Sequence, residues 1–357
     1  MTPIASAPLP VTLLSGFLGA GKTTVLNELL NQPNGLRFAV VENEFGAVNI
    51  DSQLISRNSG GIIELTNGCV CCTVNADLVR GLQDLAAQRA SGELTFDWII
   101  IETTGLADPG AVAQTFFAAP ELRESFMLDG IVVVVDALHA QRQLDEYPVV
   151  QRQVGFADRL LLSKCDVVDA QAVAELSARL NRMNPRAAQQ ELVQGRAHPN
   201  SLLGIGGFNL DASLLAVDAN SPPAARFVPR PAAASGTARW SRRAAAHGDD
   251  ISALLLEAGE VDIDRIGTFV QSMIDKFGDE LLRYKGILAI PDEARKLIFQ
   301  GVQRVVGFDY GEAWAPSEPR LSRIVLIGKS LPEARLRAAF LSAVDRAGEN
   351  RDPTTDI

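Results

Sequence analysis

A glycine-rich turn between an apolar run and a helical pattern is the feature that most constrains this chain. The apolar run is Val11–Ser15, and residues 22–30 have the spacing of an amphipathic helix. The turn fits the pattern of a glycine, any four residues, then glycine, lysine and serine or threonine. In this context the pattern predicts a phosphate-binding loop. Its residues are Gly16, Phe17, Leu18, Gly19, Ala20, Gly21, Lys22, Thr23 and Thr24.

Each part of this loop has a physical reason to be there. Glycines let the backbone curl so that successive N–H groups face one anion, and the helix N-terminus adds positive potential. We expect Lys22 to reach the β- and γ-phosphates and the Thr23 hydroxyl to ligate Mg²⁺. The alternative is a chance glycine-rich turn. The residues predicted to line the nucleotide are Gly16, Gly19, Ala20, Gly21, Lys22, Thr23 and Thr24.

A second buried run, Trp98–Ile101, ends in the residues Glu102-Thr103-Thr104-Gly105. An acid at the end of a strand beside a phosphate loop can hold Mg²⁺ through water or orient the attacking water. We therefore predict Glu102 as a catalytic residue together with Lys22 and Thr23, and the Gly105 amide as a contact of the γ-phosphate. The alternative is a solvated acid at a strand end.

The residues Ser163-Lys164-Cys165-Asp166 follow the apolar run Leu160–Leu162 and suggest how a base is chosen. A carboxylate at Asp166 can accept hydrogen bonds from guanine N1 and N2, a donor pair that adenine lacks. The stem of Lys164 would lie along the base. Ser163 stands where GTPases usually carry asparagine, which weakens the guanine prediction without removing it. The alternative is that Asp166 caps the next helix.

Three of the four cysteines lie within four residues, at Cys69, Cys71 and Cys72. Three thiolates in one loop suit a soft or borderline ion such as Zn²⁺, with Co²⁺ as a competitor. Glu42 is the candidate for a further ligand. The alternative is that the cysteines are small buried hydrophobes. Cys165 lies inside the base motif, and we interpret it as structural.

The rhythm of apolar runs and helical patterns predicts an α/β fold with a mostly parallel sheet and helices on both faces. Length favours more than one unit, since the chain has 357 residues. A small α+β domain is predicted after a Pro-, Ala- and Ser-rich stretch. The predicted units are a nucleotide-binding domain at 1–220, a linker or mobile loop at 221–250, the α+β domain at 251–347 and a tail at 348–357. Ile287–Ile290 and Val302–Val306 are among the strands expected in that second domain.

Charge and hydropathy limit the classes of partner that we expect for this chain. A formal net charge of -10 disfavours general binding to nucleic acid. The N-terminus has no signal-peptide pattern, and the apolar run Ile131–Val135 is far too short to cross a bilayer. We therefore expect a cytoplasmic protein with no membrane partner, in which clustered thiols indicate metal before disulfides.

Together these motifs resemble the CobW-type metallochaperone GTPases of the CobW, HypB and UreG group. The resemblance implies a P-loop GTPase that hydrolyses GTP with Mg²⁺, binds zinc or cobalt, and transfers the ion to a client metalloprotein. It also implies that Cys69, Cys71 and Cys72 are metal ligands with Glu42 close by. Further residues that carry the resemblance are Glu44, Phe45, Gly46, Asn184-Pro185 (similar to a base-side loop), Arg283–Leu288, Gln300–Val302, Trp314, Ser322-Arg323 and Ile327-Gly328.

Three departures separate this chain from the usual pattern. Ala47 stands where an acid is common, Ser163 replaces asparagine, and only His247 stands where many members have a histidine-rich run. The missing run argues against a metal-storage loop and against the cobalamin branch. An alternative function stays open: a GTP-dependent activator of one metalloenzyme, of the nitrile hydratase or cobalamin-pathway type, with cobalt or with structural cysteines only. A P-loop kinase of a small molecule is a weaker third class. The metal, the client and the oligomeric state stay open, with a homodimer as one option.

Overall fold

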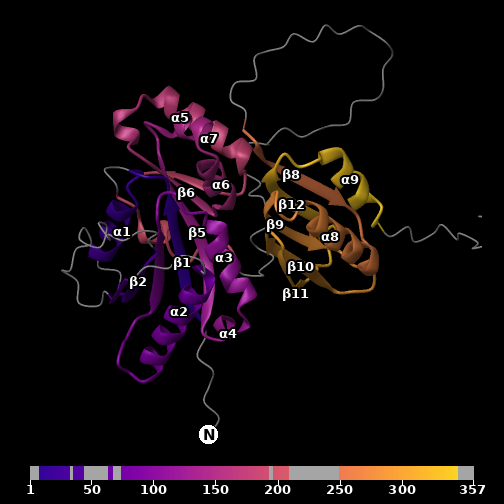
Figure 1. Ribbon diagram of the computed structural model, residues 1–357. Coiled ribbons are helices and arrows are strands. Elements are labelled where there is room, and N and C mark those ends of the chain that lie inside the picture. The colour runs from indigo at the N-terminus through magenta and orange to yellow at the C-terminus, as the bar shows by residue number, and fades with distance from the viewer. Residues whose placement is uncertain are drawn as a thin grey trace, which may run out of the picture.

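Two sheets, each with its own helices, form the molecule in a computed structural model of the chain (Figure 1). The structure describes residues 8–32, 35–43, 63–66, 74–192, 196–208 and 249–344. The predicted linker at 221–250 therefore lies, except for its last two residues, outside the described part, and the predicted domain limits stay predictions.

The first sheet has seven parallel strands in the order β3-β2-β4-β1-β5-β6-β7. This order places the strand before the phosphate loop at the centre of the sheet, between the strand that ends in Glu102 and the longest apolar strand. The strands are β1 (Leu9–Gly16), β2 (Phe38–Asn43), β3 (Ile63–Thr66), β4 (Trp98–Thr103), β5 (Phe126–Asp136), β6 (Arg159–Ser163) and β7 (Ala188–Glu191).

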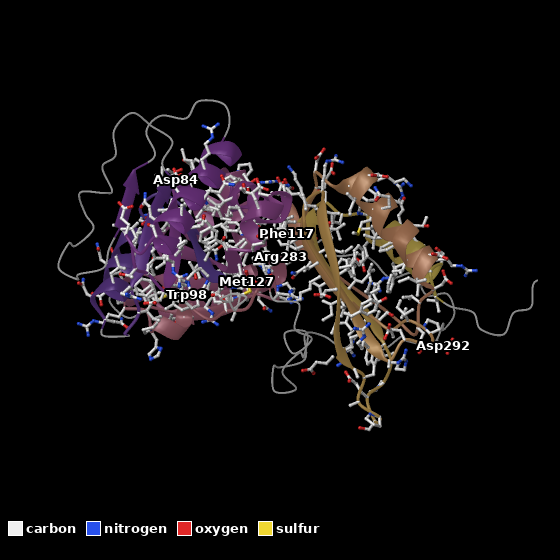
Figure 2. All side chains as sticks on the ribbon, turned by 90° about the horizontal axis from the view of Figure 1, so that it is seen from below. Asp84, Trp98, Phe117, Met127, Arg283 and Asp292 are labelled. Atoms are coloured by element: carbon white, nitrogen blue, oxygen red, sulfur yellow. The ribbon has the colours of Figure 1, made fainter. Side chains whose placement is uncertain are left out.

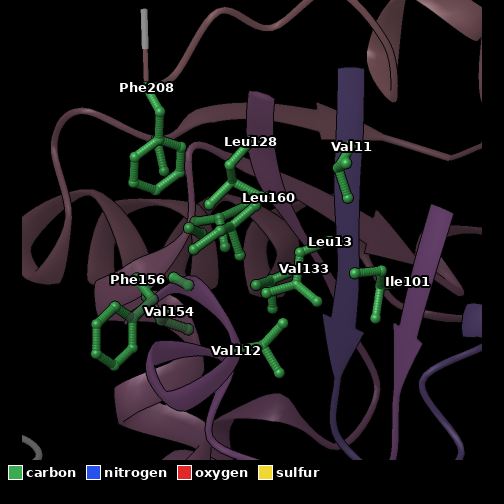
Figure 3. Close-up of a cluster of buried hydrophobic side chains, with 14 of the residues drawn as sticks. Val11, Leu13, Ile101, Val112, Leu128, Val133, Val154, Phe156, Leu160 and Phe208 are labelled. Atoms are coloured by element: carbon green, nitrogen blue, oxygen red, sulfur yellow. The ribbon is translucent and has the colours of Figure 1, made fainter. Parts of the chain in front are cut away.

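Continuous apolar strands are required here because both faces of the sheet are covered. In β5, Ile131 and Val133 enter the core on one face, whereas Val132 and Val134 enter the core that α1 covers. Figure 3 shows part of the first core, with Val133 between Leu13 and the helical residues Val112 and Val154. The helices are α1 (Lys22–Asn31), α2 (Val74–Ala90), α3 (Pro109–Ala118), α4 (Pro120–Arg123), α5 (Ala140–Glu146), α6 (Pro148–Phe156) and α7 (Ala170–Met183).

The second sheet has five antiparallel strands in the order β11-β10-β9-β12-β8. Two helices cover one face, and the predicted α+β class is confirmed. The elements are β8 (Ile251–Ala258), α8 (Ile263–Phe277), β9 (Leu281–Leu288), β10 (Arg295–Val302), β11 (Val305–Ala313), β12 (Ser322–Lys329) and α9 (Glu333–Leu341). None of the helices in the described ranges is both long and apolar enough to cross a membrane.

The predicted strand at Val302–Val306 is wrong, because a tight hairpin turn interrupts it. Val302 ends β10 and pairs directly with Val305, which begins β11. Gln303 in the turn has a φ of 51°, a left-handed conformation that the sequence signals with no glycine or asparagine. The strand predicted at Ile287–Ile290 overlaps β9 only at its end, because β9 runs from Leu281 to Leu288. The prediction began too late because the polar but buried Arg283 and Lys285 interrupt the apolar pattern.

The second sheet packs its other face against α6 of the first domain (Figure 1). Val154 and Phe156 of α6 share one apolar core with Ile251, Leu282 and Ile327 of the second domain. The fit is close at Gly155, where a Cβ atom would lie 2.4 Å from Leu282 Cδ1. This continuous core joins the two domains.

A buried charge fixes the orientation of that interface. Arg283 of β9 forms an ion pair with Asp158, with 2.6 Å between Nη1 and Oδ1, and both side chains are nearly buried. The guanidinium also donates to the carbonyl oxygen of Gly207 at 2.6 Å and lies 4.2 Å from the ring centroid of Phe208. Figure 2 shows Arg283 at the boundary between the domains, close to Phe117. Removing one partner of such a pair leaves an uncompensated buried charge.

We predict that Arg283→Met destabilises the protein by about 3 kcal/mol, because the buried Asp158 carboxylate loses its paired counter-charge. The cost stays at the low end for a buried pair because the Arg186 guanidinium, which also interacts with Asp158, remains. The matched control is Arg323→Met on β12, which removes an exposed ion pair with Glu257 and should cost less than about 1 kcal/mol. Thermal unfolding by calorimetry measures both. Equal small shifts in the two variants would contradict the structural role of the buried pair.

Candidate nucleotide and metal site

The predicted phosphate loop joins β1 to α1 and has the backbone that an anion cradle requires. Gly19 and Gly21 have φ values of 73° and 98°, in the left-handed region that favours glycine. At Gly16 a Cβ atom would lie 2.3 Å from the carbonyl oxygen of Val134, so no side chain fits. The first turn of α1 has no side-chain cap. Its N–H groups are therefore available to an anion.

Lys22, Thr23 and Glu102 meet at the mouth of this loop. The Lys22 amine donates to the carbonyl oxygen of Gly16 at 3.0 Å. The Thr23 hydroxyl donates to Glu102 Oε1 at 3.2 Å, which brings the start of α1 to the end of β4. A hydroxyl and a carboxylate are the hard oxygen donors that Mg²⁺ prefers, so these residues fit that ion. Their individual roles remain predictions.

The loop after β4 lies against the phosphate loop and is anchored from the other side by α6. A Cβ atom on Gly105 would lie 2.5 Å from the backbone nitrogen of Leu18, so only glycine allows this approach. The buried Gln153 amide of α6 donates to the carbonyl oxygens of Gly105 and Ala107, both at 3.1 Å. The loop therefore touches the predicted nucleotide site on one side and the helix that packs on the second domain on the other.

The same anchoring continues at the start of α3. Asp108 is the N-cap of α3 and accepts a hydrogen bond from the Gly110 amide at 2.9 Å. Its other carboxylate oxygen accepts from Arg152 Nε of α6 at 2.8 Å. Gln153 and Arg152, which are adjacent in α6, thus hold the loop at two points.

The predicted base motif is joined to the phosphate loop by two side chains. The Ser163 hydroxyl donates to the carbonyl oxygen of Ala20 at 2.7 Å. Lys164 has a left-handed φ of 59°, and its amine donates to the carbonyl oxygen of Gly19 at 2.9 Å. Serine in place of asparagine therefore still connects the two loops, although it offers only one hydroxyl proton.

Asp136, at the end of β5, is a functional candidate that sequence reasoning missed. Its Oδ2 accepts from Lys164 Nζ at 2.7 Å and lies 2.9 Å from His139 Nδ1. Burial raises the pKa of the Asp136 carboxyl, but the hydrogen bonds from Lys164 and His139 outweigh it, so the pKa lies below its ordinary value. An ionised Asp136 orients the lysine beside the predicted base site. The sequence could have indicated Asp136, because this acid follows the apolar run Ile131–Val135 just as Glu102 follows Trp98–Ile101.

Asp166 is exposed, and its carboxylate has no hydrogen-bond or ion-pair partner among the residues that the structure describes. The following helix, α7, is capped by Asp169, whose carboxylate accepts from the Ala172 amide at 2.8 Å. The capping alternative for Asp166 is therefore wrong, and the carboxylate is available to a ligand.

Cys165 differs from a metal-binding or reactive cysteine. Burial raises the pKa of the Cys165 thiol, and the nearby carboxylates of Glu191 and Asp166 raise it further. A thiol that stays protonated is a poor nucleophile and a poor ligand. This property agrees with a structural role for Cys165.

The predicted metal ligands Cys69, Cys71 and Cys72 lie outside the described residues, as does the side chain of Glu42. The backbone nevertheless places the start of that segment. Glu42 of β2 lies in register between Glu102 of β4 and Thr66 of β3. Strands lie about 4.8 Å apart. The chain therefore enters the cysteine segment at the carboxyl ends of the strands, the same end of the sheet as Glu102, about 10 Å from β4. Within the described ranges, no group of three His, Cys, Asp or Glu residues is placed to hold a metal ion.

Asn184-Pro185 does not lie beside the base motif, and that part of the predicted resemblance is wrong. The Asn184 amide is buried and donates to the carbonyl oxygens of Val154 and Ala157, both at 2.8 Å. These carbonyls precede β6, whereas Ser163 ends it. Asn184 therefore lies at the amino-terminal ends of the strands, opposite the end where the base motif lies. It joins the end of α7 to α6.

Comparisons with known proteins agree with this architecture. Residues 10–191 match the family "CobW/HypB/UreG, nucleotide-binding domain", and residues 252–344 match "Cobalamin synthesis protein cobW C-terminal domain". The chain is 40% identical to the zinc chaperone YjiA of Escherichia coli over 93% of this chain and 98% of that protein. It is 30% identical to the zinc chaperone CobW of Pseudomonas aeruginosa over 95% of this chain and 92% of the other.

Solved structures give the same result. The crystal structure of zinc-bound YjiA GTPase from E. coli has a TM-score of 0.73 at 35% identity, covering 95% of this chain and all of the other. A triple variant of YjiA, with a glutamate and two cysteines replaced by alanine, is also zinc-bound and has the same TM-score of 0.73.

A seven-stranded parallel sheet whose central strand leads into this glycine loop, with a threonine–glutamate pair at the mouth of the loop, defines a P-loop nucleotide-binding protein. The matched domains and the full-length relatives then specify which one. The chain belongs to the CobW/HypB/UreG family of GTPases and carries the CobW C-terminal domain.

Guanine selection provides a test of the base site. We predict that Asp166→Ala lowers GTP affinity by about 10- to 100-fold, the value of hydrogen bonds to a charged group. Inosine triphosphate lacks the exocyclic amino group and should bind the variant as well as GTP does. Titration calorimetry with both nucleotides measures the ratio.

The matched control is Asp169→Ala, an aspartate in the same loop that caps α7. Losing the cap should cost about 1 kcal/mol of stability and leave the preference for GTP over inosine triphosphate unchanged. A wild-type preference retained in Asp166→Ala would show that guanine is chosen elsewhere.

Proposed function

We propose that the chain is a GTP-hydrolysing metallochaperone that binds zinc at Cys69, Cys71 and Cys72 and transfers it to a client metalloprotein. The observation that carries the proposal is that β3 and β4 end at the same end of the sheet. There β3 leads into the cysteine segment and β4 ends in Glu102. The relatives named as zinc chaperones support zinc as the ion, which is the cargo of the protein.

The nucleotide site supports hydrolysis by residues already in place. Lys22 and the amides of the phosphate loop bind the phosphates, and Thr23 would hold Mg²⁺ with Glu102 behind it. The ion supplies charge that neutralises the β- and γ-phosphate oxygens. Glu102 orients the attacking water, and GTP and water become GDP and phosphate. Asp166 selects guanine, while Asp136 and Gly19 hold Lys164 beside the base.

Nucleotide and metal must influence one another for the cycle to deliver an ion. Hydrolysis can release zinc only if the affinity for zinc differs between the GTP and GDP states. The proposed switch is the segment 42–51, which starts from β2, the strand between β3 and β4. On the other side, the loop 104–108 relays the nucleotide state to α6 through Gln153 and Arg152.

A second candidate function is a GTP-dependent activator of one metalloenzyme, in which the cysteines are structural. The observation that favours this candidate is that a YjiA variant with a glutamate and two cysteines replaced by alanine is still zinc-bound. The test must therefore follow tight binding in solution rather than occupancy in a crystal.

The proposal predicts that zinc affinity differs at least tenfold, about 1.4 kcal/mol, between GDP and a non-hydrolysable GTP analogue. Competition with a chelating dye measures this affinity for the purified full chain. Replacing Cys69, Cys71 and Cys72 together by serine should abolish both the tight site and the nucleotide dependence, while nucleotide binding stays intact.

Cys165→Ser is the matched control and should keep both properties, because the Cys165 thiol donates to the carbonyl oxygen of Leu162 and its raised pKa makes it a poor ligand. Equal zinc affinity in the two nucleotide states would rule out a chaperone cycle. If the triple variant still activates a client, the activator function is the correct one.

A further inference from the structure

Helices α8 and α9 lie side by side on the face of the second sheet that is turned away from the first domain (Figure 1). They run antiparallel. The Asp262 amide before α8 donates to the carbonyl oxygen of Ala343 after α9 at 3.0 Å. At the other end, the Arg335 guanidinium at the start of α9 lies 5.8 Å from the ring centroid of Phe277. The pair therefore forms the two walls of a groove that is open to solvent.

This groove contains a cavity of about 410 Å³. Its floor is apolar, and its walls carry small side chains that let another backbone approach closely. The floor residues are Phe269, Met273, Phe277 and Leu336, and the small wall residues are Thr268, Ser272, Ala339 and Ser342.

The ionisable side chains that line the groove are all cationic. The ionisable residues that line it are Arg265, Lys276 and Arg335, all exposed, in a chain with a net charge of -10. The Asp275 carboxylate accepts a hydrogen bond from Gln271 at 2.8 Å and lines an adjoining hollow that shares Thr268, Ser272 and Lys276 with the groove. Cationic ends above an apolar floor are complementary to an anionic, amphipathic segment.

We propose that the groove between α8 and α9 binds an acidic amphipathic helix of a partner protein. The spacing of the cationic residues fits a helix of three turns. Arg265 and Lys276 are about 16 Å apart along α8 at 1.5 Å per residue, which is the length of three helical turns. The apolar residues of the partner would lie on the half-buried Phe277 ring and the exposed Ala339, above the core residues Phe269 and Met273, in the helix-in-groove mode. Identifying that partner with the client rests on the proposed function, but the docking itself does not.

The probe is a fluorescein-labelled 14-residue peptide with leucines at helical spacing and glutamates elsewhere, measured by fluorescence anisotropy with the full chain. We expect saturable binding that weakens with salt. Affinity should fall at least tenfold in Arg265→Glu/Lys276→Glu/Arg335→Glu and in Ala339→Trp, which fills the groove with an aromatic ring. Arg337→Glu is the matched control: Arg337 lies on α9 outside the groove, paired with Glu333, and this variant should bind like the wild type.

GTP hydrolysis and zinc affinity should be unchanged in all these variants, so failure of the docking is distinguishable from failure of the proposed function. Absence of binding, or binding that Ala339→Trp leaves intact, would overturn the proposal. Equal binding of the peptide with lysines in place of glutamates, or tighter binding of a single-stranded oligonucleotide, would also overturn it. A tenfold gain on removing residues 345–357 would assign the groove to the chain's own C-terminal segment instead.

Discussion

The approach of Gly105 to the backbone of Leu18 is the contact on which the rest of the site depends. Because no side chain fits between them, the loop after β4 rests directly on the phosphate loop. A change at a bound γ-phosphate would therefore displace the loop 104–108, which also accepts hydrogen bonds from Gln153. The nucleotide site is thus built from two loops in contact, rather than from the phosphate loop alone.

The second domain is connected to this contact through α6 and through α3, which begins where the loop ends, while α7 also contacts β8. α6 holds the loop with Arg152 and Gln153, and the next residues, Val154 to Phe156, pack into the core shared with β8, β9 and β12. The ion pair between Arg283 and Asp158 closes the same interface. A rigid joint of this kind transmits a displacement between domains, because a packed core deforms little under strain.

Local motifs explain what could be predicted from the sequence. The phosphate loop, Glu102 and Asp166 each follow an apolar run, and their types and spacing carry the chemistry without knowledge of the fold. Gln153, Asp136 and Arg283 act through partners distant in sequence, so only the folded chain reveals them. The turn at Gln303 escaped because its residue type does not signal a left-handed backbone, and Asn184 was misplaced because a short motif does not specify which sheet edge it reaches.

Hydrogen exchange of the full chain, compared between GDP and a non-hydrolysable GTP analogue, tests the central claim most directly. The account predicts that amide protection in the GTP-like state increases in residues 104–108 and also in α6 and β9, while α8 on the far face is unchanged. Protection confined to the phosphate loop and residues 104–108, with α6 and β9 identical in both states, would contradict the claim that the two domains are mechanically joined.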